Sequence, residues 1–423
     1  MPNRNIAPVT NHLQKLQLAE PESHKLDNGI PVFVFRNDQQ QALKIDFIFN
    51  SGTAGQSRPL VANSAIRLLK EGTKSYPGNK LMQHIDFYGS YISQYASKDE
   101  SDVTMMCLKK DFQQVIPFIE SMLKEPSFVP KAFGIIRNIT KEEFIIRSEK
   151  PKNIALKAIY ELVFGNDTPY GVSTQVNDYD TLRLEDLKDF YRNNYGSNNC
   201  YIILSGPIDH TIMNLVHQHI GSAWNADGKP NDFNQVTYFK PTKEHIIKKD
   251  ALQSAIQIGM PMVHRTHADF IPFQLLNILF GGYFGSRLMS NIREDKGYTY
   301  GIHSNISAFQ QGSIFTISTE TGSAVTQATM EEIQKEMKIL QNETISTEEL
   351  DLVKNYLSGS YMRSLDGVYN QAEKFKSIQG FALGMDYYEK SLQKIQQTQQ
   401  DELKELANKY LNYDAMTTVI VGA

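Results

Sequence analysis

The second half of the chain repeats the order of segments in the first half, which strongly constrains the fold. Three pairs of segments match in the same order, offset by about 207 to 216 residues in a chain of 423. The pairs are KLMQHIDFYGSYISQYAS (80–97) with RLMSNIREDKGYTYGIHS (287–304), IDFIFN (45–50) with IQIGMP (256–261), and FYRNNYGSNNCYIILSG (190–206) with ANKYLNYDAMTTVIVG (407–422). Because the chain is too long for one ordinary core, we expect two equivalent halves.

Each half has the same predicted order of elements: strand, helix, helix, strand pair, long helices and a final strand. This order predicts an α+β fold in which an antiparallel sheet is covered by helices on one side. We expect the first half at residues 1–222 and the second at 251–423. Residues 223–250 between them include NADGKPNDFNQ, and its Gly, Pro, Asn and Asp are typical of a linker.

Composition excludes several classes of protein. Apolar residues make up 41% and charged residues 21%, as in an ordinary globular protein, and the formal charge of −4 comes with no basic block. We therefore expect no nucleic-acid partner and no membrane partner. The N-terminus has no apolar signal segment, so a cytoplasmic location is the default expectation, and a periplasmic one if a signal was trimmed.

A degenerate motif lies at residues 60–73, which read LVANSAIRLLKEGT after a strand pattern and end at Gly72-Thr73. This segment resembles HFLEHMLFKGT of the pitrilysin and mitochondrial processing peptidase family, the insulinase-type zinc peptidases with the inverted motif H-x-x-E-H. Aligned on Gly-Thr, the first histidine falls at Asn63, the glutamate at Ile66 and the second histidine at Arg67. An amide, a hydrocarbon and a permanent cation cannot hold zinc or activate its water, so we expect no metal.

The resemblance to the family extends over the whole chain, from HKLDNGIPVFVF (24–35) to the terminal TTVIVGA. TPYG (168–171) matches the family's His-Pro-Tyr-Gly turn, with Thr168 in place of the histidine. The resemblance implies the clam-shell of the processing peptidases, built from two homologous halves.

A carboxylate remains where the family has its third zinc ligand. ITKEEFIIRSE supplies Glu142 and Glu143 at the expected distance. Without histidines, a buried carboxylate there would need another cation, and Arg67 is one candidate. The alternative, that both glutamates are ordinary exposed helix charges, is weighted equally.

A second family motif is intact in SRLMSNIREDKGYTYG (286–301). It resembles the family's C-terminal substrate-binding motif, and the match falls on Arg293 and Tyr300. In the family, this arginine grips substrate carbonyls and the tyrosine donates to the scissile carbonyl, which fits the donor chemistry of both groups. The equivalent first-half positions are Asp86 and Ile92, so the duplication alone does not explain the pair. The glycine-rich LFGGYFGSRL (279–288) before it resembles a loop of noncatalytic family subunits, or is a simple turn.

These motifs predict a catalytically inactive subunit of a heterodimeric zinc metallopeptidase. Its partner would be a homologous H-x-x-E-H subunit that holds the zinc, and its substrate an unfolded peptide; the chain itself would have no cofactor. The alternative is a noncatalytic structural or peptide-binding protein, like the core subunits of respiratory complex III. A self-sufficient peptidase with another metal site is disfavoured. His217 and His219 would face different directions along a probable helix, and no glutamate lies between or beside His264 and His267.

Overall fold

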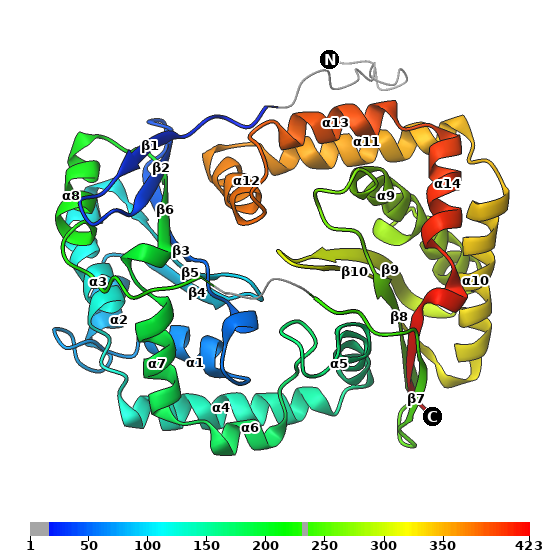
Figure 1. Cartoon of the computed structure of the whole chain (residues 1–423), viewed down its shortest axis with the longest axis horizontal. Coiled ribbons are helices and arrows are strands. Elements are labelled where there is room, and N and C mark those ends of the chain that lie inside the picture. The colour runs from blue at the N-terminus through cyan, green and yellow to red at the C-terminus, as the bar shows by residue number, and fades with distance from the viewer. Residues whose placement is uncertain (1–16, 231–235) are drawn as a thin grey trace, which may run out of the picture.

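The computed structural model describes residues 17–230 and 236–423, which form two mixed sheets surrounded by helices (Figure 1). The first sheet has the order β1 (Glu22–Lys25), β2 (Pro31–Arg36), β6 (Cys200–Gly206), β3 (Ala42–Phe49), β5 (Ser101–Leu108) and β4 (Tyr91–Ala96). The second has the order β7 (Lys243–Ile247), β11 (Thr417–Gly422), β8 (Gln253–Pro261), β10 (Ser313–Gly322) and β9 (Thr299–Ala308). Two halves of α+β type are thus confirmed.

Each sheet contains one parallel pair, whereas the sequence predicts purely antiparallel sheets. β2 is parallel to β6, and β11 is parallel to β7, while the other neighbours are antiparallel. A parallel pair needs a long crossover, and here nearly a whole half of the chain separates its two strands. Alternation within a strand indicates which face is buried, but it carries no information about strand direction.

Burial patterns explain why these segments form strands and helices. β5 alternates between buried and half-exposed residues along SDVTMMCL, as expected for a strand with one face toward a core. The central strand β6 is buried at every position. Helix α3 (Phe112–Lys124) buries Phe112, Val115, Ile116 and Ile119, which is the spacing of one helical face.

Helices of each half cover the outer face of its own sheet. The first core is closed by α1 (Val61–Leu68), α2 (Lys80–Phe87), α3, α7 (Leu184–Asn194) and α8 (His210–Ile220). The second is closed by α9 (Phe270–Asn277), α10 (Thr326–Asn342), α11 (Thr347–Ser364), α13 (Tyr387–Gln397) and α14 (Gln400–Tyr410).

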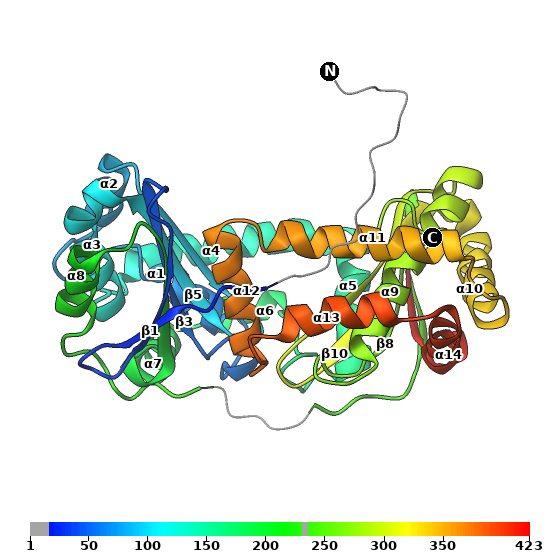
Figure 2. The same ribbon diagram turned by 90° about the horizontal axis from the view of Figure 1, so that it is seen from above.

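Two helices cross over and cover the sheet of the other half (Figures 1 and 2). α5 (Pro151–Phe164), reached through α4 (Pro130–Ser148), packs on β8 and β11 of the second sheet. A Cβ at Gly259 of β8 would lie 2.9 Å from Ile159 Cγ1, so glycine permits this close approach. In return, α12 (Val368–Gly380) packs on β6 and β2, where Phe375 lies 4.7 Å from Phe33 between ring centroids. The two halves therefore share their cores.

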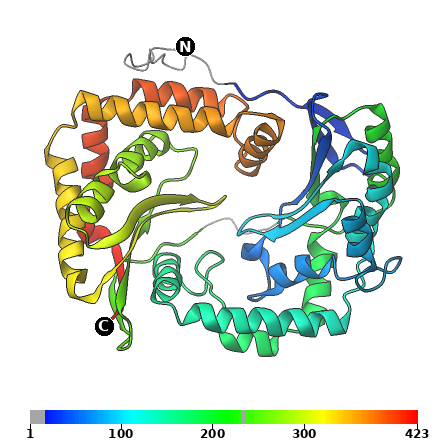
Figure 3. The ribbon, with the colours of Figure 1, turned by 180° about the vertical axis from the view of Figure 1, so that it is seen from behind.

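The connecting helices follow the perimeter of the molecule. α4 and α11 run along opposite edges, as the view from behind shows (Figure 3). The segment 223–250, expected as a linker, contains strand β7, and its residues 231–235 lie outside the described residues. Within 17–230 and 236–423, no helix combines the length and the apolar content needed to cross a bilayer.

Candidate substrate-binding site

The degenerate motif lies on α1 and does not fit a zinc ion. Asn63 and Arg67 are exposed, whereas Ile66 is only 1% exposed and belongs to the core of the first half. A zinc site needs imidazoles one turn apart and a carboxylate that reaches the bound water, and none of these groups is present. In the described part of the chain, no group of three or more His, Cys, Asp and Glu could hold a metal ion.

The predicted contact between Arg67 and Glu142 or Glu143 is wrong. Glu143 instead pairs with Arg147 one helical turn further along α4, at 3.8 Å, and neither glutamate forms an ion pair with Arg67. The local partner requires no contact between helices, so it forms at little entropic cost. Tyr179 of α6 (Val176–Thr181) lies near these groups, and burial raises its pKa. The glutamates are thus exposed helix charges, as the alternative interpretation held.

The TPYG turn joins the two halves. Thr168 Oγ1 donates to the carbonyl of Phe164 at 2.8 Å, and the buried Tyr170 donates its hydroxyl to Asp99 at 2.6 Å. Backbone amides of Gln310 and Gln311, in the β9–β10 turn, donate to Asp99 at 2.9 Å and to Tyr170 at 3.1 Å. Burial raises the pKa of both Asp99 and Tyr170. The sequence indicated the turn, but not this network between the halves.

Arg293 lies on a π-helical turn, Met289–Asp295, that precedes β9. Its guanidinium carbon lies 4.5 Å from the ring centroid of Phe284, which is 62% exposed. It forms no hydrogen bond or ion pair with any residue in the described ranges. A cation over an exposed ring keeps its hydrogen-bond donors available for a ligand.

The glycine-rich segment 279–288 presents Phe284 to Arg293. A Cβ at Gly281 would lie 2.6 Å from Ser304 Oγ on β9, so only glycine allows the loop to pass this close to the strand. The half-buried Tyr283 that follows packs at a tilted angle on Tyr356 of α11, with 4.7 Å between the ring centroids. The segment thus has a packing role beside the candidate site.

Tyr300, at the start of β9, is 91% exposed. Its hydroxyl has no hydrogen-bond partner among residues 17–230 and 236–423. The ring lies at a pocket of about 380 Å³ between the second sheet and the first turn of α5. The structure therefore places Tyr300 at an accessible pocket, while Arg293 is held separately on its helical turn.

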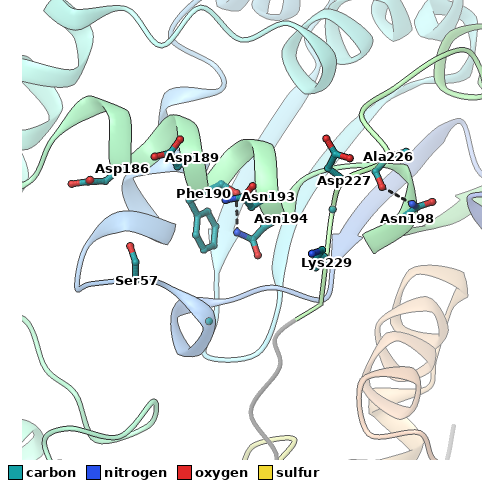
Figure 4. Close-up of a pocket in the computed structure, with 12 residues that line it drawn as sticks. Ser57, Asp186, Asp189, Phe190, Asn193, Asn194, Asn198, Ala226, Asp227 and Lys229 are labelled. Carbon is teal, nitrogen blue, oxygen red and sulfur yellow. Dashed lines mark hydrogen bonds between the residues drawn. The ribbon is translucent and has the colours of Figure 1, made fainter.

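Another pocket, of about 940 Å³, lies in the first half beside α7 (Figure 4). Asp186 and Asp189 line it on one side and Asp227 on the other, and Asn198 donates to the carbonyl of Ala226. The hydrogen bond from Arg183 lowers the pKa of Asp186, so this carboxylate is already engaged. The pocket was not indicated by the sequence, and it contains neither Arg293 nor Tyr300.

Three of the four histidines considered as metal ligands are engaged in ordinary contacts. His219 Nδ1 lies 2.7 Å from Glu120 Oε2, and His264 Nε2 lies 3.0 Å from the carbonyl of Gln310. His267 Nδ1 accepts from the backbone amide of Asp269 at 3.0 Å.

Comparisons with known proteins agree with this architecture. Residues 61–174 match the family described as insulinase (peptidase family M16), and residues 181–357 match the family described as peptidase M16 inactive domain. The chain is 21% identical to an uncharacterized zinc protease, YmxG, of Bacillus subtilis over 350 residues, which cover 82% of this chain and 85% of that protein. It is also 21% identical to a non-peptidase homolog, YmxG, of Helicobacter pylori, over 84% of this chain and 83% of the homolog.

Solved structures show the same fold. A peptidase M16 inactive domain from Pseudomonas fluorescens superposes with a TM-score of 0.87 at 22% identity, covering 96% of this chain and 98% of that chain. A protease from Helicobacter pylori also gives a TM-score of 0.87, at 17% identity, and covers 96% of this chain and 100% of its own. The family resemblance and the fold expected from the sequence are confirmed.

Proposed function

Since the chain belongs to the M16 (insulinase-like) peptidase family and matches the M16 inactive domain at residues 181–357, we propose that it is a noncatalytic peptidase subunit. It would supply Arg293 and Tyr300 to a homologous partner that carries H-x-x-E-H and the zinc. The substrate would be an unfolded peptide bound in extended form along a sheet edge of the partner.

One contrast supports this proposal most directly. α1 has lost every group that could hold or use zinc, yet Arg293 and Tyr300 keep donors that no described residue occupies. A guanidinium and a phenol can both donate to carbonyl oxygens, and such fixed donors matter most when charge develops on the oxygen. A purely structural protein would have no use for this pair.

The test is to mix the chain with an H-x-x-E-H homologue from the same host and to measure hydrolysis of an unfolded peptide library. Alone, the chain should cleave nothing and should bind no stoichiometric zinc at residues 63–67 by elemental analysis. In the mixture, Tyr300→Phe should reduce turnover on the order of 10²-fold with little loss of heterodimer, because one donor to a developing oxyanion is removed. Arg293→Ala should also weaken substrate binding.

Tyr413→Phe is the matched control, since this half-buried tyrosine lies far from β9 in the sequence and next to Lys243. It should leave turnover unchanged. An inactive mixture, or an active mixture in which both site variants match wild type, would instead support the structural or peptide-binding role.

A further inference from the structure

The pocket beside Tyr300 has an ordered polar floor. His303 of β9, Ser318 of β10 and Gln257 of β8 are direct neighbours across three adjacent strands, in the pairs Ser318↔His303 and Ser318↔Gln257. All three residues line the pocket. Directly opposed residues on neighbouring strands point to the same face of a sheet, so their side chains form one row.

Gln257 has a fixed orientation and an unused donor. The residue is only 6% exposed, and its Oε1 accepts a hydrogen bond from Ser318 Oγ at 2.6 Å. Its Nε2 donates to no residue within 17–230 or 236–423, and it is not among the fully enclosed unpaired atoms. Because the residue lines the pocket, the amide N–H groups are left for a ligand there. A ligand that fills the pocket would enclose these N–H groups, and an enclosed donor without an acceptor is costly, so a ligand that supplies an acceptor is favoured.

The charges around the pocket are balanced. Lys152, in the first turn of α5, lies 3.9 Å from Glu320 of β10, and both line the pocket. An ionised ligand group would lose its hydration on entering the pocket, and the pocket has no excess of opposite charge that would compensate this cost. An apolar group would leave the Gln257 donor unpaired.

We propose that this pocket holds one side chain of a bound extended peptide, that this side chain ends in a carboxamide (Gln or Asn), and that Gln257 determines the preference. A carboxamide offers an acceptor for the Gln257 N–H and donors for Glu320. The volume of about 380 Å³ is more than one long side chain fills, so such a side chain can enter together with part of the peptide backbone. The inference rests on the proposed function, because the peptide that enters the pocket must lie beside Tyr300.

The test measures the binding of fluorescein-labelled host peptides to the full chain by fluorescence anisotropy. The host is a short, alternating serine and valine peptide with one guest residue: Gln, Asn, Glu, Lys or Leu. Because the host sequence is uniform, the peptide can shift along the binding surface until its guest residue lies at the pocket. We expect the Gln and Asn guests to bind roughly tenfold more tightly than the Leu guest, as for one well-placed hydrogen bond. Equal affinity for all guests would overturn the inference.

Two variants assign the preference to Gln257. Gln257→Met should abolish the preference, whereas the matched control Asn305→Met, an exposed amide on β9 outside the pocket, should retain it. Gln257→Glu adds a negative charge and should switch the preference to the Lys guest. A misfolded variant would lose affinity for all guests, so this new preference cannot result from misfolding. If Gln257→Met keeps the wild-type preference, the assignment is wrong.

The outcomes separate this inference from the proposed function. If all guests bind equally but Arg293→Ala weakens every peptide, the proposed function stands and the pocket inference falls. If no peptide binds to the chain at all, the inference falls as well, and peptide hydrolysis by the mixture with the H-x-x-E-H homologue decides the proposed function independently.

Discussion

Arg67 lies on the exposed side of α1, and no carboxylate of the described residues lies within ion-pair distance. Removing an unpaired surface charge leaves no carboxylate without its cation. Arg67→Met should therefore change the free energy of unfolding by less than about 0.5 kcal/mol. Urea denaturation of both proteins measures this. A loss well above that value would mean that the guanidinium has a stabilising partner.

Inference from sequence at the residue scale is firmest where the chemistry of the side chains alone decides. Asn63, Ile66 and Arg67 cannot form a zinc site in any conformation, so the loss could be inferred without coordinates. The partner of Arg67 could not be inferred in this way, because the number of residues between two helices does not give their separation in space. Glu143 has Arg147 four residues further along, and this local spacing is the signal in the sequence that could have identified the observed partner.

At the scale of single elements, α12 attaches to the first sheet through charged groups as well as Phe375. Lys376 pairs with Asp102 of β5 at 2.8 Å, and Lys44 of β3 pairs with Glu373 of α12 and, at 3.0 Å, with Asp46. The contact between α5 and the second sheet is apolar instead, and it buries Ala155, Ile159 and Val163. The two crossed helices therefore differ in how they are held.

Lys376→Met tests the charged contact. The variant leaves Asp102 largely buried without its cation, which should cost on the order of 3–5 kcal/mol of unfolding free energy. The double variant Lys376→Met/Asp102→Leu replaces both groups and should recover much of that loss. Chemical denaturation of the wild type, of Lys376→Met, of Asp102→Leu and of the double variant completes the double-mutant cycle. An additive cycle would show that the pair is not coupled.

Glu100 makes the same contact sensitive to pH. Burial raises its pKa from 4.5 to about 7, Lys376 opposes the shift, and Asp102 and Asp99 add to it. The folded protein thus keeps a proton that the unfolded chain loses near pH 4.5. The free energy of unfolding should fall as pH rises from about 4.5 to about 7, by on the order of 3 kcal/mol in total.

Glu100→Gln should remove this dependence and make the protein more stable than wild type at pH 8. Thermal or urea unfolding across this pH range measures the slope. Glu405→Gln, at an exposed position of α14, is the matched control and should keep the wild-type slope. An unchanged slope in Glu100→Gln would assign the pH dependence to other groups.

The exchange of α5 and α12 could not be predicted from sequence. Ala155, Ala158, Ile159 and Val163 reveal one apolar face, but helical periodicity does not say which sheet the face will meet. The prediction therefore placed each helix with its own half. The exchange is seen only in the structure, for example in the close approach at Gly259 and in the packing of the Phe33 and Phe375 rings.

At the scale of the whole molecule, the duplication predicted most of the architecture. Its three matched segment pairs correspond to β3 with β8, α2–β4 with the turn of Arg293 and β9, and β6 with β11. These elements occupy equivalent places in the two sheets, because equivalent sequences bury equivalent faces. The two copies differ at the site that the proposed function uses: Arg293 and Tyr300 of the second half correspond to Asp86 and Ile92 of the first.

The exchanged helices imply that neither half is stable alone. A fragment of residues 1–222 would expose the apolar face of α5, and the first sheet would lose the cover of α12. A fragment of residues 251–423 would in turn uncover β8 and β11, where α5 packs. Each fragment should lack a cooperative thermal transition by circular dichroism, since buried apolar area supplies most of the stability of a domain.

Mixed together, the two fragments should associate and regain a cooperative transition, because α5 can again pack on β8 and β11, and α12 on β2 and β6, without a covalent link. Size-exclusion chromatography would show a complex with one copy of each fragment. The control is a mixture in which the 1–222 fragment carries Ile159→Asp, which places a charge against Gly259 and should prevent association. If either wild-type fragment unfolds cooperatively by itself, the crossed helices are additions to two independent domains, and the shared core is not what makes the chain fold as one unit.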